Sequence, residues 1–276
     1  RGHRVYGTDE MYVGDQYKAI SHVWSLLTTG RKLLVSRTES VIESNGTLTT
    51  GETFTYDSRN NISEHTVTGS ARSGASSPKR ITKYSYAWDI SSTVNDAMKA
   101  ANLVAIPVKV EEYVNSTTAA NRLSTRTTTY KAVSAGPASP SRTLYVKEGE
   151  SLTVDAAPSD GSAPSSGSRT LSYGTYDRRG NVMERTGLDG RTEVWLWGYR
   201  GQYPVARIRG ASLNAVLSRV DTSRLNTGTQ SQVAAQLSSL RNAWSDNASV
   251  HVETWTWQPL VGLSTATDPS GRSFSW

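Results

Sequence analysis

Cysteine is absent from this chain of 276 residues, and phenylalanine occurs only twice. Without thiols the protein has no disulfide framework, no thiolate zinc site and no cysteine nucleophile. The 13 tyrosines and 8 tryptophans supply most of the aromatic side chains. Aromatic rings with a polar tip suit pleated surfaces with wet edges better than helix bundles, so the composition favours a β-sheet protein.

Long apolar runs are missing too. No stretch approaches the roughly 18 consecutive apolar residues of a membrane-spanning helix, so we expect no membrane span. The first residues, Arg1 to Arg4, lack the apolar core of a signal peptide, and the chain begins without methionine. We therefore interpret the sequence as an internal fragment and place any export signal outside it.

A concentrated basic segment is also lacking. The 30 basic and 24 acidic side chains give a formal net charge of +6 that is spread along the chain. Nucleic-acid binding normally shows a basic stripe or a module signature, and neither is present. We therefore expect no nucleic-acid partner.

Familiar catalytic motifs do not occur. The sequence has no Gly-x-Ser-x-Gly elbow, no Walker loop and no dinucleotide fingerprint, and its four histidines lack metal-ligand spacing. We expect no metal, no cofactor, no catalytic residues and no enzymatic activity. A glycosidase-type pair of Asp and Glu stays open as an alternative, because its separation of about 5 to 9 Å is a property of the fold.

Strand-like segments bounded by turn residues fill most of the chain and predict a mainly β fold. Three stretches rich in Ser, Gly, Pro and Ala, residues 70–78, 134–141 and 156–168, are expected to be exposed loops. The predicted strands are residues 32–41, 52–56, 80–86, 106–114, 123–133, 169–176, 192–199, 203–209 and 250–257.

Helical periodicity is confined to three places. One apolar stripe runs from Val94 to Ala101, a second from Leu213 to Val220 and a third from Val233 to Trp244. The last two lie between two predicted strands. We therefore expect a short two-helix insertion at residues 211–249 that packs one face on the sheet.

One turn pattern recurs along the chain. Tyr176 stands at the end of a predicted strand, and the carboxylate of Asp177 can accept hydrogen bonds from the backbone of the turn. Gly180 then supplies a positive φ, and Asn181 follows it directly. The pattern predicts a tight β-hairpin turn.

The same pattern begins at Tyr56 and Asp57, where Asn60 stands in place of glycine. Partial copies contain Asp189 and Gly190, and Asp268, Pro269 and Gly271. Repetition of one hairpin unit indicates a stacked architecture, in which neighbouring hairpins complete each other's core.

The segment Tyr-Asp-Arg-Arg-Gly-Asn at residues 176–181 resembles the YD repeats of RHS-type proteins. Residues 197–206 and 254–263 with the Thr-Asp-Pro at 267–269 are similar to a block of large YD-repeat proteins; the resemblance is strong from Ser172 onward and weak before Gly51. It implies stacked antiparallel β-hairpins of a hollow YD-repeat shell, which in bacterial competition often encloses a variable C-terminal toxin domain.

The resemblance also implies partners and a location. The partners are neighbouring repeats of the same parent chain, an encapsulated C-terminal domain or surface glycans, and the protein is expected to be secreted or at the cell surface of a bacterium. The expected organisation is a divergent strand-rich part at 1–50, a hairpin array at 51–210, the helical insertion at 211–249 and further repeat strands at 250–276 that continue beyond the fragment.

The Asp-Pro pair at residues 268–269 has a second interpretation. RHS shells that release their toxin cut near an Asp-Pro-x-Gly-Leu motif, but Arg272 stands here in place of the leucine. Proline at the second position of the turn and glycine at the fourth describe a type I turn. We therefore predict an ordinary turn.

Two aromatic rows alternate along predicted strands. Trp195, Trp197 and Tyr199 form one row, and Trp255 and Trp257 form the other. Such rows either stack on sugar rings or pack within a sheet, and we favour sheet packing. We expect a non-catalytic structural or interaction module, and a carbohydrate-binding surface is the main alternative. We also expect an unpaired sheet edge that promotes self-association.

Overall fold

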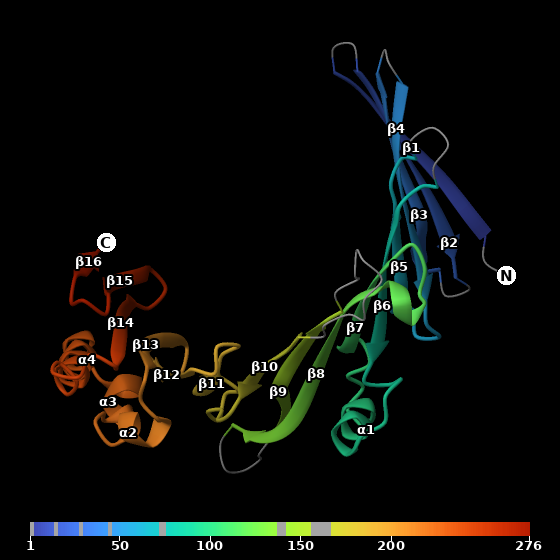
Figure 1. The fold of residues 1–276 in the computed structure, drawn as a ribbon. Helices are drawn as coiled ribbons and strands as arrows, with labels where there is room; N and C mark the ends of the chain where they lie inside the picture. The colour runs from blue at the N-terminus through green and yellow to red at the C-terminus, as the bar shows by residue number, and fades with distance from the viewer. Residues whose placement is uncertain are drawn as a thin grey trace. The chain divides into compact units, whose positions relative to one another are not determined.

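The computed structural model of the chain describes residues 3–13, 16–27, 30–43, 46–71, 76–136, 142–155 and 167–276. Within them the protein is mainly β. The strand order in the sheet, β1 to β16, is the order of the strands in the sequence, and every described register is antiparallel (Figure 1). The centres of the three predicted loops, residues 72–75, 137–141 and 156–166, lie outside the described residues.

The strands are β1 (His3–Val13), β2 (Gln16–Leu26), β3 (Lys32–Glu43), β4 (Gly46–Tyr56), β5 (Ile62–Thr68), β6 (Lys79–Tyr86), β7 (Pro107–Val114), β8 (Arg122–Ala135), β9 (Arg142–Val154), β10 (Gly167–Tyr173), β11 (Glu184–Thr186), β12 (Thr192–Gly198), β13 (Tyr203–Arg209), β14 (His251–Gln258), β15 (Gly262–Thr267) and β16 (Ser273–Ser275). The helices are α1 (Thr93–Ala100), α2 (Leu213–Leu217), α3 (Thr222–Thr227) and α4 (Gln230–Asn242), with one 3₁₀ turn at Ala119–Asn121.

The chain divides into two compact units. Unit 1 comprises residues 1–128 and 151–168, and unit 2 comprises residues 129–150 and 169–276. The boundaries expected at residues 50, 210 and 249 stay predictions.

Unit 1 has a small core. The strands β3 to β5 carry no fully buried side chain among their described residues. The buried apolar residues begin with Ile81 on β6 and continue with Met98 on α1 and Tyr113 on β7. The side chain of Ser92 caps α1 by accepting a hydrogen bond from the backbone N–H of Asn95 at 3.1 Å.

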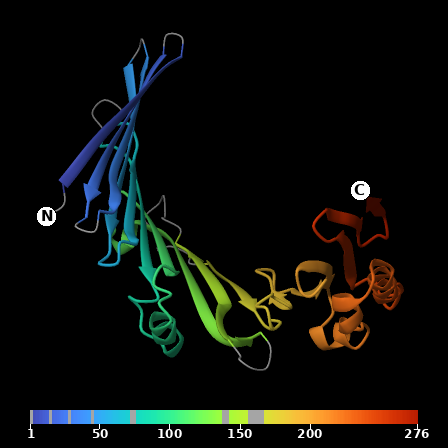
Figure 2. The ribbon, with the colours of Figure 1, turned by 180° about the vertical axis from the view of Figure 1, so that it is seen from behind.

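Unit 2 has the main core, formed where helices cover the sheet. In both views of the ribbon, Figures 1 and 2, helices α2, α3 and α4 lie against β12 to β14. Alternate residues of these strands point toward the helices and are buried, as the two-residue period of a strand requires. The residues of this core with at most 1% exposure are Val194, Leu196, Val205, Ala206 and Ile208 on the strands and Val216, Leu225, Val233 and Leu240 on the helices.

The insertion contains three helices, not the two predicted. Residues 211–249 are all described, and α3 lies between the two helices that the apolar stripes indicated. Asp221 caps α3 through hydrogen bonds from the backbone N–H groups of Ser223 and Arg224. The helix has six residues and buries Leu225 alone, so it leaves no periodic signal in the sequence.

The turn after β12 is built to receive α3. The backbone N–H of Tyr199 donates to the carbonyl of Leu225 at 2.8 Å, and that of Arg200 donates to Asn226 at 3.0 Å. These bonds satisfy carbonyls at the end of a helix that have no partner within it. A Cβ atom on Gly198 would lie 2.8 Å from the carbonyl oxygen of Leu225, so glycine permits this close approach.

Each of the nine predicted segments falls on a strand. Besides the nine strands that these segments overlap, the described residues contain β1, β2, β5, β9, β11, β15 and β16.

Candidate functional site

Four hairpins whose turn residues are all described share one five-residue turn; the same two backbone bonds also close residues 27–31, of which residues 28–29 lie outside the described part of the chain. In each, the N–H of the first residue donates to the carbonyl of the fifth, and the N–H of the fourth donates to the carbonyl of the first. The fourth residue has a positive φ, and the geometry is a type I turn followed by a left-handed residue. The turns are residues 57–61, 177–181, 187–191 and 268–272, with φ of 66° at Asn60, 85° at Gly180, 73° at Gly190 and 90° at Gly271.

In the two Tyr-Asp turns, 57–61 and 177–181, the first residue is an aspartate whose carboxylate binds the turn itself. Oδ1 of Asp57 accepts hydrogen bonds from the backbone N–H groups of Arg59 at 2.8 Å and Asn61 at 2.9 Å, and its Oδ2 accepts one from Nδ2 of Asn61 at 2.9 Å. Asp177 makes the same three bonds at the same distances. These carboxylates are therefore engaged in holding the backbone.

The fifth residue ties each of these turns to a later hairpin. Nδ2 of Asn61 donates to the carbonyl of Val104 at 3.1 Å, and Nδ2 of Asn181 donates to the carbonyl of Gly201 at 2.8 Å. In both units the acceptor lies beyond the next two strands. In unit 1 the guanidinium of Arg59 also lies over the ring of Trp88. In each unit the asparagine of the repeat thus fastens its turn to a loop two strands later.

The Asp-Pro segment forms the same turn, as its sequence pattern predicted. Oδ1 of Asp268 accepts hydrogen bonds from Oγ of Ser270 at 2.7 Å and from the backbone N–H of Arg272 at 3.0 Å. Nε of Arg272 donates to Oδ2 at 2.8 Å, where asparagine donates in the other two turns. The Ser270 hydroxyl is the main cause that lowers the pKa of Asp268 to about 2.

The fourth turn uses its aspartate differently. Gly187 stands at the first position and Asp189 at the third, so the carboxylate of Asp189 is not placed like that of Asp177. Its Oδ1 accepts one hydrogen bond from the backbone N–H of Arg191 at 3.1 Å. This turn is held by Gly190, its two backbone bonds and this single side-chain bond.

A second feature also repeats along the chain: each shift in strand register lies next to an aromatic residue. The sequence did not reveal this feature. A β-bulge places one extra residue on one strand of a pair, as Val205 does on β13 opposite Leu196 and Trp197. Every register shift among the described strand pairs falls immediately before a Tyr or Trp: Trp24, Tyr56, Tyr86, Tyr113, Trp197 and Trp257.

Five aromatic side chains, four of them at these positions, hydrogen-bond to a preceding strand or its flanking residues. We call each such contact an aromatic lock. In unit 1, Oη of Tyr56 donates to the carbonyl of Leu34 and Oη of Tyr86 to that of Ile62, both at 2.7 Å. In unit 2, Oη of Tyr176 donates to the carbonyl of Lys147. Nε1 of Trp197 donates to the carbonyl of Val182 at 2.8 Å, and Nε1 of Trp257 donates to that of Pro204 at 2.7 Å. The locks satisfy the polar tips of half-buried rings.

The predicted row of Trp195, Trp197 and Tyr199 does not form one continuous face. Strand β12 ends at Gly198, and Tyr199 lies in the turn with a φ of 52° and packs against the helix-covered core. Its Oη accepts a hydrogen bond from the backbone N–H of Trp257 at 3.0 Å. Period-two alternation ends here because the strand ends at Gly198 and Tyr199 lies in the following turn.

Trp195 and Trp255 meet on the sheet face opposite the helices. Their rings are stacked with centroids 6.1 Å apart, and the guanidinium of Arg207 lies 5.6 Å from the Trp195 ring centroid. Arg207 also donates to both carboxylate oxygens of Glu253, at 2.6 and 2.7 Å. The two tryptophans therefore contact each other across the sheet, as cross-strand packing residues do.

Glu193 is the most buried carboxylate on this face. Its relative exposure is 8%, and it accepts hydrogen bonds from Arg185 and from Nε of Arg209, the latter at 2.8 Å. Burial raises its pKa, but hydrogen bonds from the two guanidinium groups outweigh this effect and lower the pKa. The charge is paired from both neighbouring strands.

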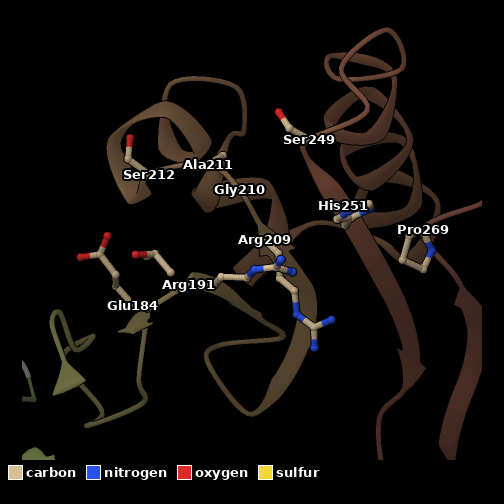
Figure 3. Close-up of a pocket in the computed structure, with 10 residues that line it drawn as sticks. Glu184, Arg191, Arg209, Gly210, Ala211, Ser212, Ser249, His251 and Pro269 are labelled. Atoms are coloured by element: carbon tan, nitrogen blue, oxygen red, sulfur yellow. The ribbon is translucent and has the colours of Figure 1, made fainter. Parts of the chain in front are cut away.

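A cleft of about 810 Å³ lies at the end of β13 in unit 2. Figure 3 shows Arg209 and His251 beside it on paired strands, with Ser212 and Ser249 on the loops that flank the helices. Glu184 is the one carboxylate among the described residues that line it. Two facing carboxylates, as a glycosidase requires, are not brought together in this cleft.

Among the described residues, no group of three or more His, Asp or Glu side chains is arranged to hold a metal ion. None of the described helices combines the length and apolarity needed to cross a bilayer.

Comparison with known proteins finds no matching family model and no matching curated protein. Among solved structures, the chain is similar to a porin-like protein from Bacteroides uniformis, with 13% sequence identity over 74% of this chain and 93% of that chain. The TM-score is 0.19, which supports no conclusion about fold or function.

Proposed function

We propose that this chain is a non-catalytic structural module of a YD-repeat protein of the RHS type, and that it forms part of a β-sheet shell or cell-surface scaffold. The observation that carries the proposal is the pair of identical turns at 57–61 and 177–181, each tied by its asparagine to the backbone of a later hairpin. The most recognisable side chains of the repeat act on the chain's own backbone.

The electrostatics of the sheet support the same function. Glu193, Glu253 and Glu52 are each paired with arginine, and Asp57 and Asp177 are held by turn N–H groups. A carboxylate that acts as a general acid needs a raised pKa, which burial without a cationic partner produces. Hydrogen bonds from two arginines instead lower the pKa of Glu193.

The partners that follow from this proposal are neighbouring repeats of the same parent chain, with an enclosed C-terminal toxin domain as cargo. The location that follows is the bacterial surface or exterior. Both extend the resemblance of the Tyr-Asp turns to YD repeats.

Carbohydrate binding is the rival function, and the contact between Trp195 and Trp255 separates the two. A sugar platform needs ring faces open to solvent, whereas these rings stack on each other and both are half-buried. A structural role predicts that each tryptophan contributes to stability. A sugar-binding role predicts that removal of either ring abolishes glycan binding at little cost in stability.

The test uses Trp195→Ala and Trp255→Ala in the full chain, with Leu260→Ala as a control for loss of a fully exposed apolar side chain. Thermal melts and a glycan array are recorded for each. We expect both tryptophan variants to melt at lower temperature than the control, and wild type to bind no glycan. Specific glycan binding that disappears in both variants while their melting temperatures match the control would overturn the structural proposal.

A further inference from the structure

The cleft at the end of β13 is rich in hydrogen-bond donors that no described residue uses. Nε of Arg209 donates to Glu193 at 2.8 Å, which orients the guanidinium, while its Nη groups make no hydrogen bond to any residue that the structure describes. Arg191 lines the same cleft; its side chain is 79% exposed, and its ion pair with Asp189 spans 3.8 Å. Two guanidinium groups therefore offer N–H donors to one cavity.

Ser212 adds a neutral donor to the cleft. Its Oγ accepts a hydrogen bond from the backbone N–H of Ala215 at 3.3 Å, so its own hydroxyl hydrogen is left to donate elsewhere. Ser249 instead donates its hydroxyl hydrogen to Oδ1 of Asn247 at 2.6 Å, which holds the loop before β14 in place. His251, the first residue of β14, offers a ring N–H.

The one carboxylate among the described residues that line the cleft stands apart from these donors. Figure 3 shows Glu184 at the side of the cleft away from His251. Its Oε2 lies near the backbone of Gly174, where an added Cβ atom would be 2.9 Å from it. Donors thus prevail over acceptors in the rest of the cleft, which suits a ligand with oxyanion groups.

The walls of the cleft are held together where the two strands meet. Gly210, directly after β13, has a φ of 85°, and a Cβ atom on it would lie 2.1 Å from the carbonyl oxygen of Ser249. Only glycine allows the two segments to approach so closely. The donors are therefore preorganised, which reduces the entropy lost when a ligand binds.

The lining also indicates which kind of anionic ligand fits. Nucleic acids and sugars are commonly bound by stacking on aromatic rings, and no Trp, Tyr or Phe is found among the described residues that line the cleft. Its volume of about 810 Å³ is far larger than a free carboxylate or phosphate needs, and Ala211 and Pro269 add apolar surface. A peptide that carries carboxylates among small apolar side chains matches this lining.

We propose that this cleft binds an acidic peptide segment of a partner protein. Its Asp or Glu carboxylates are held by the Nη groups of Arg191 and Arg209 and by the hydroxyl of Ser212. The net charge of +6 on the chain favours the approach of an acidic partner. The inference goes beyond the structural function proposed above, because it gives the module a partner of stated chemistry, and its test is separate from that of the tryptophan variants.

The probe is a short fluorescein-labelled peptide in which Glu and Ala alternate, and the control peptide carries Gln in place of each Glu. Fluorescence anisotropy measures the binding of both peptides to the full chain. We expect saturable binding of the Glu peptide that weakens as salt is added, and no binding of the Gln peptide. Equal binding of the two peptides, or binding of neither, would overturn the proposal.

A matched pair of arginine variants tests the cleft itself. Arg191→Ala should weaken binding of the Glu peptide about tenfold, because charge-assisted hydrogen bonds are lost from an exposed side chain. Arg224→Ala removes the same charge from another exposed arginine of unit 2 that does not line the cleft, and should leave binding unchanged. Equal weakening by both variants would mean that the peptide responds to net charge alone, and would overturn the site.

Ser212→Asp tests the position of the hydroxyl while it keeps the helix cap. Aspartate can accept the same backbone N–H as serine at the start of α2, but its negative charge should weaken binding of the Glu peptide at least about tenfold. Ser223→Asp places the same charge on an exposed residue of α3 outside the cleft lining and should change binding little. Thermal melts check that both variants fold, and equal effects of the two on binding would contradict the proposal.

Competition separates a peptide ligand from other anions. Inorganic phosphate and a single-stranded oligonucleotide are each titrated against the bound Glu peptide. We expect phosphate to displace the peptide only at far higher concentration than unlabelled Glu peptide does, and the oligonucleotide to compete more weakly than the peptide. Phosphate binding as tight as that of the peptide would assign the cleft to a small oxyanion, and tighter binding of the oligonucleotide would assign it to nucleic acid; either result overturns the proposal.

Discussion

The helix-covered strands of unit 2 and the uncovered strands of unit 1 use the same turn but are stabilised in different ways. On β12 and β13, Val194 and Ile208 have no exposed surface, because helices cover them. On β3 to β5, no described side chain is fully buried, and neighbouring strands are joined by polar contacts. One repeat is thus compatible with two means of stabilisation.

The polar contacts of unit 1 form a row across its strands. Arg37 on β3 bridges to Glu52 on β4 at 3.0 Å, and Nε2 of His65 on β5 lies 3.0 Å from the other oxygen of Glu52. Phe54 stacks on His65 with centroids 4.5 Å apart. Exposed pairs of this kind contribute little individually, so the aromatic locks and the turns carry more of the specificity in unit 1.

The largest difference in stability between the two units is expected when one isoleucine in each unit is replaced by alanine. Ile208→Ala in unit 2 should lower the free energy of unfolding by about 3 kcal/mol, because it leaves a cavity in the covered core. Ile20→Ala on half-buried β2 should cost about 1 kcal/mol, because water reaches the site. Denaturation followed by hydrogen exchange on peptides from each unit measures both values. Equal losses would mean that the two units do not differ in core burial as described.

The next effect concerns the left-handed turn position. Gly180→Val should cost about 1 to 3 kcal/mol, because valine is strained at a φ of 85° and its Cβ would lie 2.9 Å from Leu144. Glu184→Ala in the same unit should cost no more than about 0.5 kcal/mol. Thermal melts compare the two variants. In unit 1, Asn60→Gly should be close to neutral, since glycine adopts its φ of 66° freely.

A smaller effect is expected from the turn ties. Asn61→Ala and Asn181→Ala each remove two side-chain hydrogen bonds and should each cost about 1 kcal/mol in their own unit. Hydrogen exchange should accelerate at the acceptor segments around Val104 and Gly201, respectively. Acceleration confined to the turn that carries the substitution would show that the tie to the later hairpin is not formed in solution.

The smallest expected effect concerns the stability of the fold at alkaline pH. Burial raises the pKa of Tyr86 in unit 1 and of Tyr176 in unit 2 to about 12. Because the folded pKa lies above the unfolded value of about 10, this contribution to stability is complete below pH 10 and is lost as the pH rises through about 12. Ultraviolet titration of Tyr86→Phe and Tyr176→Phe should each lose one late-titrating tyrosine. Tyr145→Phe serves as a control for removal of a tyrosine without a lock.

The sequence was most informative where local chemistry decides structure. Asp57, Asp177 and Gly180 predicted their turns because the preferences for an accepting carboxylate and a positive φ act within five residues. The β-bulges before Tyr56 and Trp197 were not predicted, because a bulge depends on the partner strand as much as on its own residues. Tyr199 was misplaced on the face of Trp195 for a different reason, because β12 ends at Gly198 and Tyr199 lies in the turn.

The candidate site was harder to predict than the fold. Asn181 stands out as part of the repeat, but its acceptor, the carbonyl of Gly201, is a backbone atom that carries no sequence signal. The contact between Trp195 and Trp255 joins strands that are separated by the whole helical insertion. Long-range pairs of this kind follow from register, which only the assembled sheet determines.

The sequential strand order has a consequence for how the protein is made. Each new strand pairs with the strand synthesised just before it, so most contacts join residues close in sequence and the entropy of loop closure is small. Hairpins can therefore add to the growing sheet one at a time while the chain emerges from the ribosome. The exception is β14, which must wait for 41 residues, 210–250, before it can pair with β13.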